Sequence, residues 1–340
     1  MNFATRVGIA TALLAAFGGA IAFLSVGSRT QPVAQGTVRW ESSAQCKACH
    51  EDVFAEWYGS HHQIAFLNPE VRAQSEDFRK EECMDCHLPR PLAVTGFGKL
   101  PLPRRTHFDE GVSCISCHLG PDGGILARND RPEVPCKTKR SEEFFAVDTC
   151  ASCHNQHLTT DQWRASRFAT LGTDCSACHM PEVPRARSDK STRMGRSHAF
   201  PGAHDKAMLQ KAATFAVTHE GNEVVLALTN VGAGHNFPTE ERHRAVDMLY
   251  RFVTKDGAAA TWTLAHRARQ PYRDESQPVT AGAASGENTQ LPASATKAVR
   301  LPIPAGAIAV EARLWYRLTP FCGDDSPMST LLEERRLDLP

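Results

Sequence analysis

The chain has 340 residues, and its 38 basic and 38 acidic side chains give a formal net charge of zero at pH 7. This length fits two domains preceded by a short leader. Because the charges balance, no overall positive field attracts a nucleic acid, and we expect no nucleic-acid partner.

The first thirty residues are expected to target the chain to a membrane. An uncharged run from Val7 to Gly27 follows Arg6, and it is long enough to cross the bilayer as an inner-membrane anchor. The alternative is a signal peptide that is cleaved near the small-x-small pattern at 20–22. Both alternatives place the remainder of the chain in the periplasm.

The pattern Cys-x-x-Cys-His occurs five times. Its members are Cys46, Cys49 and His50; Cys83, Cys86 and His87; Cys114, Cys117 and His118; Cys150, Cys153 and His154; and Cys175, Cys178 and His179. In c-type haem attachment the two thiols bind the porphyrin covalently and the histidine is the proximal ligand of the iron. We therefore expect five c-type haems.

Neither chance nor zinc binding accounts for this pattern. A chain of this composition is expected to contain about 0.02 copies by chance. Cysteine pairs also bind zinc, but a zinc site does not need a histidine directly after every second cysteine. The spacing favours haem.

Residues 31–205 are expected to form the haem domain. Frequent prolines, nine of them between Pro89 and Pro184, predict short helices joined by long loops. Large apolar side chains are too few here to close a core, so we expect the haems to supply the buried apolar surface.

An internal repeat lies within this region. The segment from Trp57 to His62 follows the first motif and aligns with the segment from Trp163 to Phe168, which follows the fourth. His62 is thus a candidate distal haem ligand, and Phe168 stands where its counterpart would be. One haem must then take its sixth ligand from another segment, or leave that position open.

Ten histidines lie outside the motifs, and some of them are candidates for the distal side of the irons. His107 precedes the third motif by seven residues, and His198 and His204 flank the turn that ends the haem domain. Two imidazoles on one iron leave only electron transfer, whereas an open position permits small-molecule chemistry. The distal candidates are His62, His107, His157, His198, His204 and His235.

Residues 206–340 are expected to form an antiparallel β-sandwich, so that the fold class is α+β. Alternating or β-branched runs separated by turn residues predict strands at 213–218, 223–231, 246–254, 298–301 and 308–318. The polar loop at 232–244 either reaches the nearest haem with His235 or is a solvent-facing turn. Cys136 and Cys322, the cysteines outside the motifs, either form a disulfide or are two separate thiols.

With these motifs, residues 40–204 resemble the multihaem cytochrome c superfamily that includes cytochrome c nitrite reductase and hydroxylamine-oxidoreductase-type proteins. Besides the five motifs, the shared patterns are Trp-x-x-Ser-x-His ending at His62, His-x-x-x-Gly-Val-x-Cys ending at Cys114, and Cys-His-Met-Pro starting at Cys178. The C-terminal part is similar to a β domain appended to many periplasmic multihaem cytochromes, through patterns at 198–204 and 234–239.

The resemblance implies a chain of closely packed haems, mostly with two histidine ligands each, that acts as a relay. We expect single electrons to pass from a quinol-linked membrane donor to a periplasmic or outer-membrane acceptor. Nitrite reductases of this superfamily typically carry a lysine in place of one motif histidine, and all five motifs here end in histidine. The alternative is an oxidoreductase with one five-coordinate haem that acts on a nitrogen or sulfur species, with Arg164, Arg167 and His157 binding an anion near Phe168.

Overall fold

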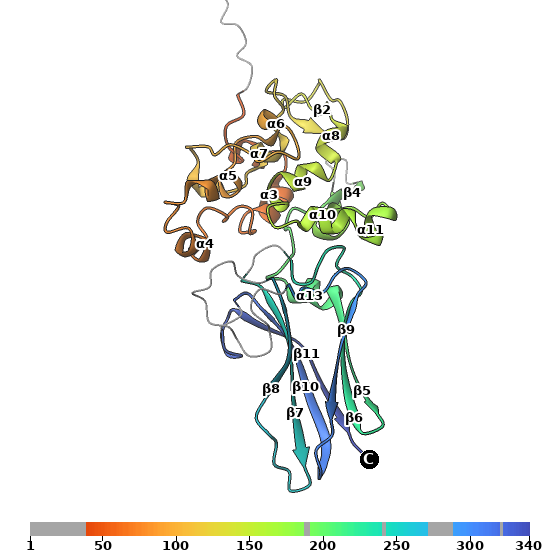
Figure 1. Cartoon of the computed structure of the whole chain (residues 1–340). Helices are drawn as coiled ribbons and strands as arrows, with labels where there is room; N and C mark the ends of the chain where they lie inside the picture. Colours follow the sequence, from red (N-terminus) through yellow and green to blue (C-terminus); the bar gives the residue numbers. More distant parts are fainter. Residues whose placement is uncertain (1–38, 187–190, 240–242, 271–287, 320–321) are drawn as a thin grey trace, which may run out of the picture. The chain divides into compact units, whose positions relative to one another are not determined.

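The computed structural model describes residues 39–186, 191–239, 243–270, 288–319 and 322–340 (Figure 1). Those from Trp40 onwards belong to one compact unit, Trp40–Pro340. The expected targeting segment lies outside the described residues. Within the described ranges, no helix has both the length and the apolar character needed to cross a membrane.

Short helices joined by loops make up the first part of the chain, as predicted. Among the described residues, none of these helices exceeds seven residues, since prolines and glycines interrupt the chain at short intervals. The helices are α2 (Ala44–Lys47), α3 (Glu51–Trp57), α4 (Pro69–Gln74), η1 (Glu81–Cys83), α5 (Met84–His87), α6 (Leu92–Thr95), η2 (Phe108–Glu110), α7 (Cys114–His118), α8 (Glu142–Phe145), α9 (Asp148–His154), α10 (Thr159–Arg164), α11 (Arg167–Thr170), α12 (Cys175–His179) and α13 (Lys206–Ala212).

Two small sheets in this part were not predicted. A parallel bridge joins β1 (Leu126–Ala127) to β2 (Lys139–Arg140), and an antiparallel hairpin is formed by β3 (Glu182–Ala186) and β4 (Thr192–Arg196). Proline is unusual within a strand, and β3 contains Pro184. The hairpin has only two strands, so both are edge strands, and proline is tolerated in an edge strand.

Two antiparallel sheets form the second part and face each other in Figure 1. One has the order β5-β6-β9 and the other the order β11-β10-β7-β8. The strands are β5 (Ala213–Glu220), β6 (Glu223–Asn230), β7 (Ala245–Thr254), β8 (Thr263–Arg269), β9 (Thr296–Pro302), β10 (Ala307–Arg317) and β11 (Ser329–Asp338). The α+β expectation, with an antiparallel C-terminal part, is confirmed.

The sequence prediction missed β8 and β11. In β8 the side chains of Arg267 and Arg269 are buried, and arginine at inward positions hides the alternation of a strand. In β11 the run from Glu333 to Arg336 is charged on both faces, although Leu332 packs into the core. Pairing with β10 along its whole length, rather than apolar periodicity, makes this segment a strand.

The apolar core of the described residues lies almost entirely in the sandwich. Eighteen buried side chains, among them Leu226, Val246 and Leu314, form one cluster between the sheets. In the helical part the corresponding cluster has three members, Phe78, Met84 and Leu88. The helical part therefore lacks a protein core of its own.

Candidate haem-binding sites

Each attachment motif lies within about one helical turn. α7 and α12 coincide with the third and fifth motifs, and α5 and α9 end at His87 and His154. In the first motif the backbone N–H of His50 donates to the carbonyl of Cys46 at 3.0 Å. Residues three and four positions apart share one face of a helix, so both thiols and the histidine of a motif face the same side. This arrangement fits a porphyrin lying against that face.

Three proximal histidines are oriented by backbone carbonyls. The Nδ1 atoms of His87, His118 and His179 lie 3.0, 3.0 and 2.7 Å from the carbonyl oxygens of Ala65, Leu126 and Pro201. A hydrogen bond at Nδ1 leaves Nε2 as the nitrogen that can bind a metal and fixes the direction in which it points. These histidines fit the role of haem ligands.

Three pairs of imidazole rings stand at the separation that an iron between them requires. A metal–imidazole bond is about 2.0 Å and the ring centre lies roughly 1.1 Å behind the nitrogen, so two such rings have centres about 6.2 Å apart. The observed distances are 6.0 Å for His62 and His154, 6.3 Å for His118 and His198, and 6.2 Å for His179 and His235. In each pair one histidine belongs to an attachment motif.

Two of the opposing histidines, His62 and His198, are buried in a way that favours the neutral imidazole. Burial lowers the pKa of His62 to about 3 and that of His198 to about 4. A neutral imidazole has the free lone pair that a metal needs. The Nδ1 atoms of His198 and His235 lie 3.0 and 2.9 Å from the carbonyls of Arg196 and Asn236.

Glu56 of α3 holds His198 in place, and the sequence had no signal for this role. Its carboxylate accepts a hydrogen bond from the backbone N–H of His198 at 2.9 Å. The same carboxylate forms an ion pair with Arg185 of β3, whose side chain is buried. The β3–β4 hairpin is thereby tied to the segment that carries His198.

The other distal candidates do not face a motif histidine in the described residues. His204 stacks on His61 with ring centres 3.8 Å apart, which leaves no room for an iron between them. His107 is exposed, has a left-handed backbone with φ 49°, and makes no ring contact within the described ranges. His157 is half-buried, and its Nδ1 has no hydrogen-bond partner among the described residues.

The internal repeat has a structural counterpart. The indole N–H of Trp57 donates to the carbonyl of Val112, and that of Trp163 donates to the carbonyl of Thr173, both at 2.9 Å. Each acceptor lies two residues before a motif cysteine. The same two residues donate their own N–H groups to the carbonyls of His62 and Phe168, at 2.8 and 2.9 Å. Two equivalent modules therefore exist, one with the first and third motifs and one with the fourth and fifth.

Thiols of different motifs meet within each module. Cys46 lies next to Cys114, and Cys150 lies next to Cys175. Haems attached at these cysteines would be neighbours, a consequence of folding that the sequence did not reveal.

Cys136 and Cys322 are thiols in different surroundings. Cys322 donates to the carbonyl of Thr319 at 2.9 Å and lies 3.0 Å from the hydroxyl of Ser329. Cys136 lies near Cys46 and contributes to raising the pKa of that thiol. Both cysteines are free, so the structure contains separate thiols rather than a disulfide.

Exposed apolar side chains surround the motifs. Apart from Val231, the large apolar side chains that are exposed in the described residues lie between Tyr58 and Met194. Such side chains usually lie inside. Their exposure fits a region whose buried apolar surface includes the porphyrins.

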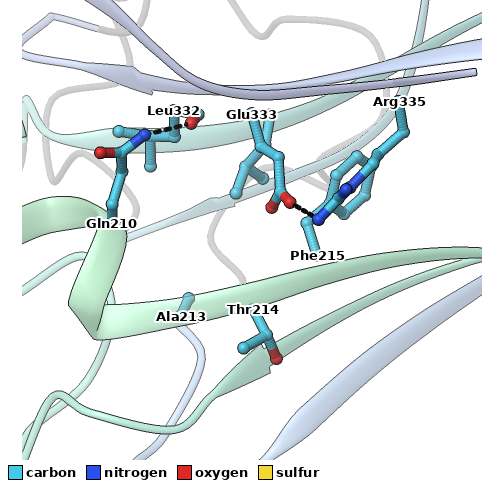
Figure 2. A pocket seen from close by; sticks show the side chains of 8 residues that line it. Gln210, Ala213, Thr214, Phe215, Leu332, Glu333 and Arg335 are labelled. Atoms are coloured by element: carbon cyan, nitrogen blue, oxygen red, sulfur yellow. Dashed lines mark hydrogen bonds and ion pairs between the residues drawn. The ribbon is translucent and has the colours of Figure 1, made fainter.

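A cavity of about 250 Å³ lies in the sandwich, among α13, β5, β10 and β11 (Figure 2). Its lining residues are Gln210, Ala213, Thr214, Phe215, Leu314, Leu332, Glu333 and Arg335. The side-chain amide of Gln210 donates a hydrogen bond to the carbonyl of Leu332 at 2.8 Å, and Arg335 forms an ion pair with Glu333. Because no histidine or cysteine lines it, this cavity does not belong to the candidate haem sites.

Comparisons with known proteins agree with this geometry. The family model described as "Cytochrome c554 and c-prime" matches residues 45–119, which contain the first three motifs. A penta-haem cytochrome c552 from Thermochromatium tepidum has a similar fold, with a TM-score of 0.65 and 18% sequence identity over 88% of this chain and 99% of that chain. A search of curated proteins finds no match.

Proposed function

We propose that this chain is a multihaem c-type cytochrome that relays single electrons outside the cytoplasm, from a quinol-linked membrane donor to a periplasmic or outer-membrane acceptor; the match of residues 45–119 to a cytochrome c family model and the fold shared with a penta-haem cytochrome support this. The observation that carries the proposal is the set of three imidazole pairs with ring centres 6.0–6.3 Å apart. Two histidine ligands on one iron exclude substrates from it and leave electron transfer.

The chain's own residues have defined roles in this proposal. The ten motif cysteines anchor five haems, and the motif histidines His50, His87, His118, His154 and His179 are the proximal ligands. His62 and His198 are the distal ligands opposite His154 and His118. His107, His157 and His204 stay predictions, since none of them faces a motif histidine.

Contacts between motifs support a continuous path for electrons. Cys46 lies next to Cys114, and Cys150 lies next to Cys175. His62 links the modules, because it follows the first motif in the chain and faces the histidine of the fourth. Neighbouring haems are what single-electron transfer requires. The transient contacts of redox partners are small, so no large apolar surface is needed for docking.

A second candidate function is small-molecule redox chemistry at the first motif. His50 is exposed, and no second imidazole is in ring contact with it within the described ranges. Partial burial lowers the pKa of His50, and the nearby Arg193 of β4 lowers it further. Arg193 also brings a positive charge for an anion. The arginines near Phe168 are less suitable, because Arg164 pairs with Asp148 and Asp161, and Arg167 binds the carbonyl of Val231.

Reoxidation kinetics distinguish the two functions. The fully reduced protein is mixed with nitrite, hydroxylamine or sulfite in a stopped-flow spectrometer, and in parallel with an oxidised c-type cytochrome. The relay predicts fast reoxidation by the protein acceptor and no reaction with the small molecules above the buffer rate. If nitrite, hydroxylamine or sulfite reoxidised the protein, and Arg193→Gln abolished this reaction, the relay proposal would be wrong and the enzyme proposal would take its place.

A further inference from the structure

The loop that follows β6 brings a histidine of the sandwich into the haem region. His235 faces His179 of the fifth motif, with ring centres 6.2 Å apart and ring planes only 17° from parallel. Both Nδ1 atoms are hydrogen-bonded to backbone carbonyls, that of His179 to Pro201 and that of His235 to Asn236. A hydrogen bond at Nδ1 makes Nε2 the nitrogen through which each ring would bind an iron between them.

The sandwich fixes His235 from its own side. The carbonyl of His235 accepts a hydrogen bond at 2.8 Å from the side-chain amide of Asn230, which ends β6 and is fully buried. The same amide donates to the carbonyl of Leu291 at 3.1 Å. Two residues after the histidine, Phe237 belongs to the sandwich core. The backbone that carries His235 is thus bonded to the strands and the core of the sandwich.

Helix α10 of the haem region holds the loop from the other side. The side-chain oxygen of Gln162 accepts hydrogen bonds from the N–H of Asn236 at 3.1 Å and from the hydroxyl of Thr239 at 2.7 Å. The hydroxyls of Thr159 and Thr239 lie 2.9 Å apart. The loop is therefore bonded to both parts of the chain.

Gly234 allows this close approach. A Cβ at this position would lie 3.1 Å from the indole ring of Trp163 and 3.3 Å from Phe168. Phe168 is the position at which the internal repeat has lost its histidine. In the first module the equivalent residue, His62, faces the histidine of the next module, whereas in the second module the chain meets the sandwich loop.

We propose that the sandwich supplies, through His235, the sixth ligand of the haem attached at Cys175 and Cys178. The sandwich is then a structural part of the last haem site and not only an appended docking domain. This inference rests on the proposed haem ligation, but it concerns the ligand of one haem and does not depend on whether the molecule is a relay or an enzyme.

Ligand replacement in the mature full-length protein tests the proposal. In His235→Gly we expect one additional high-spin haem per chain in the low-temperature electron paramagnetic resonance spectrum of the oxidised protein. We also expect one additional equivalent of carbon monoxide bound by the reduced protein. Added imidazole should fill the vacated space and restore the low-spin signal. The matched control is His219→Gly, because His219 is an exposed histidine of β5.

A second variant keeps the test decisive if the glycine variant is unstable. His235→Met preserves a ligand, and methionine in place of histidine raises the potential of a c-type haem, so one of five redox transitions should move upward. An unchanged spin state, carbon monoxide stoichiometry and set of potentials in both variants would overturn the proposal. Each readout compares a variant with the wild type. A different haem that reacts with a substrate would therefore contradict the proposed relay function but would not affect the assignment of His235 as a ligand.

Discussion

Asp247 shows how single residues stabilise the sandwich. Its carboxylate is 1% exposed and accepts hydrogen bonds from Arg267 at 2.6 and 2.7 Å and from Arg317 at 2.6 Å. Asp247, Arg267 and Arg317 belong to β7, β8 and β10, so the cluster joins three strands. A buried ion pair is not necessarily stabilising in itself, but removing one partner leaves uncompensated charge inside the protein.

We expect Asp247→Asn to lower the free energy of unfolding of the sandwich by about 3–5 kcal/mol, because the buried guanidinium groups of Arg267 and Arg317 lose a charged partner inside the protein; Arg317 keeps its pair with Asp324. The measurement is denaturant unfolding followed by circular dichroism in the strand region. The control, Glu220→Gln, removes an exposed pair with Arg300 and should leave the free energy of unfolding nearly unchanged, because exposed ion pairs contribute little to stability. Equal effects of the two substitutions would contradict this account.

At the residue scale, the sequence predicts covalent chemistry better than it predicts ligand pairs. Attachment needs two thiols and a histidine at fixed local spacing, so the five motifs are visible without a structure. The pairing of His62 with His154 spans many residues and depends on tertiary packing. His235 is visible in the sequence, and so is Phe168, which stands where the internal repeat would place a histidine. Only the fold shows that the loop of His235 packs on Phe168.

At the scale of elements, a single glycine lets two loops of the haem region cross. Gly111 has φ +39°, and a Cβ there would lie 2.4 Å from the carbonyl oxygens of His62 and Gln63. The next residue, Val112, donates its N–H to the carbonyl of His62 at 2.8 Å. This crossing holds the backbone of His62 while its side chain faces His154.

We expect Gly111→Ala to cost about 3 kcal/mol or more, because the new methyl group overlaps two carbonyl oxygens and the backbone is strained. The displaced His62 should leave its iron, which electron paramagnetic resonance would show as one new high-spin haem. Gly202→Ala is the control, since a Cβ there meets nothing within 4 Å. A fully low-spin Gly111→Ala protein of normal stability would refute the assigned role of the glycine.

Strand prediction succeeded for mostly apolar strands and failed where charged side chains occupy much of the strand. β6 and β10 have apolar inward residues and were predicted close to their observed bounds. β8 was missed because Arg267 points inward, where Asp247 of the neighbouring strand compensates its charge. That compensation is a tertiary contact, and no local pattern reveals it.

At the scale of the whole molecule, the two parts are stabilised in different ways. The sandwich has a cluster of eighteen buried side chains, whereas the helical part has a cluster of three. Helices of seven residues or fewer are not stable alone in water. The helical part therefore depends on its haems for apolar surface, and on the bonds from Gln162 to the sandwich loop for part of its position.

We therefore expect a full-length chain in which all ten motif cysteines are alanine to retain the sandwich and lose the helical part. Hydrogen exchange with mass spectrometry should find β6 and β10 as protected as in the mature protein, because their core contains no haem. The amides of α9 and α12 should exchange at nearly unprotected rates, since nothing replaces the porphyrin surface. Protection of α9 and α12 in the haem-free chain would mean that protein contacts alone fold this region. The haems would then bind to a preformed scaffold and would not form its core.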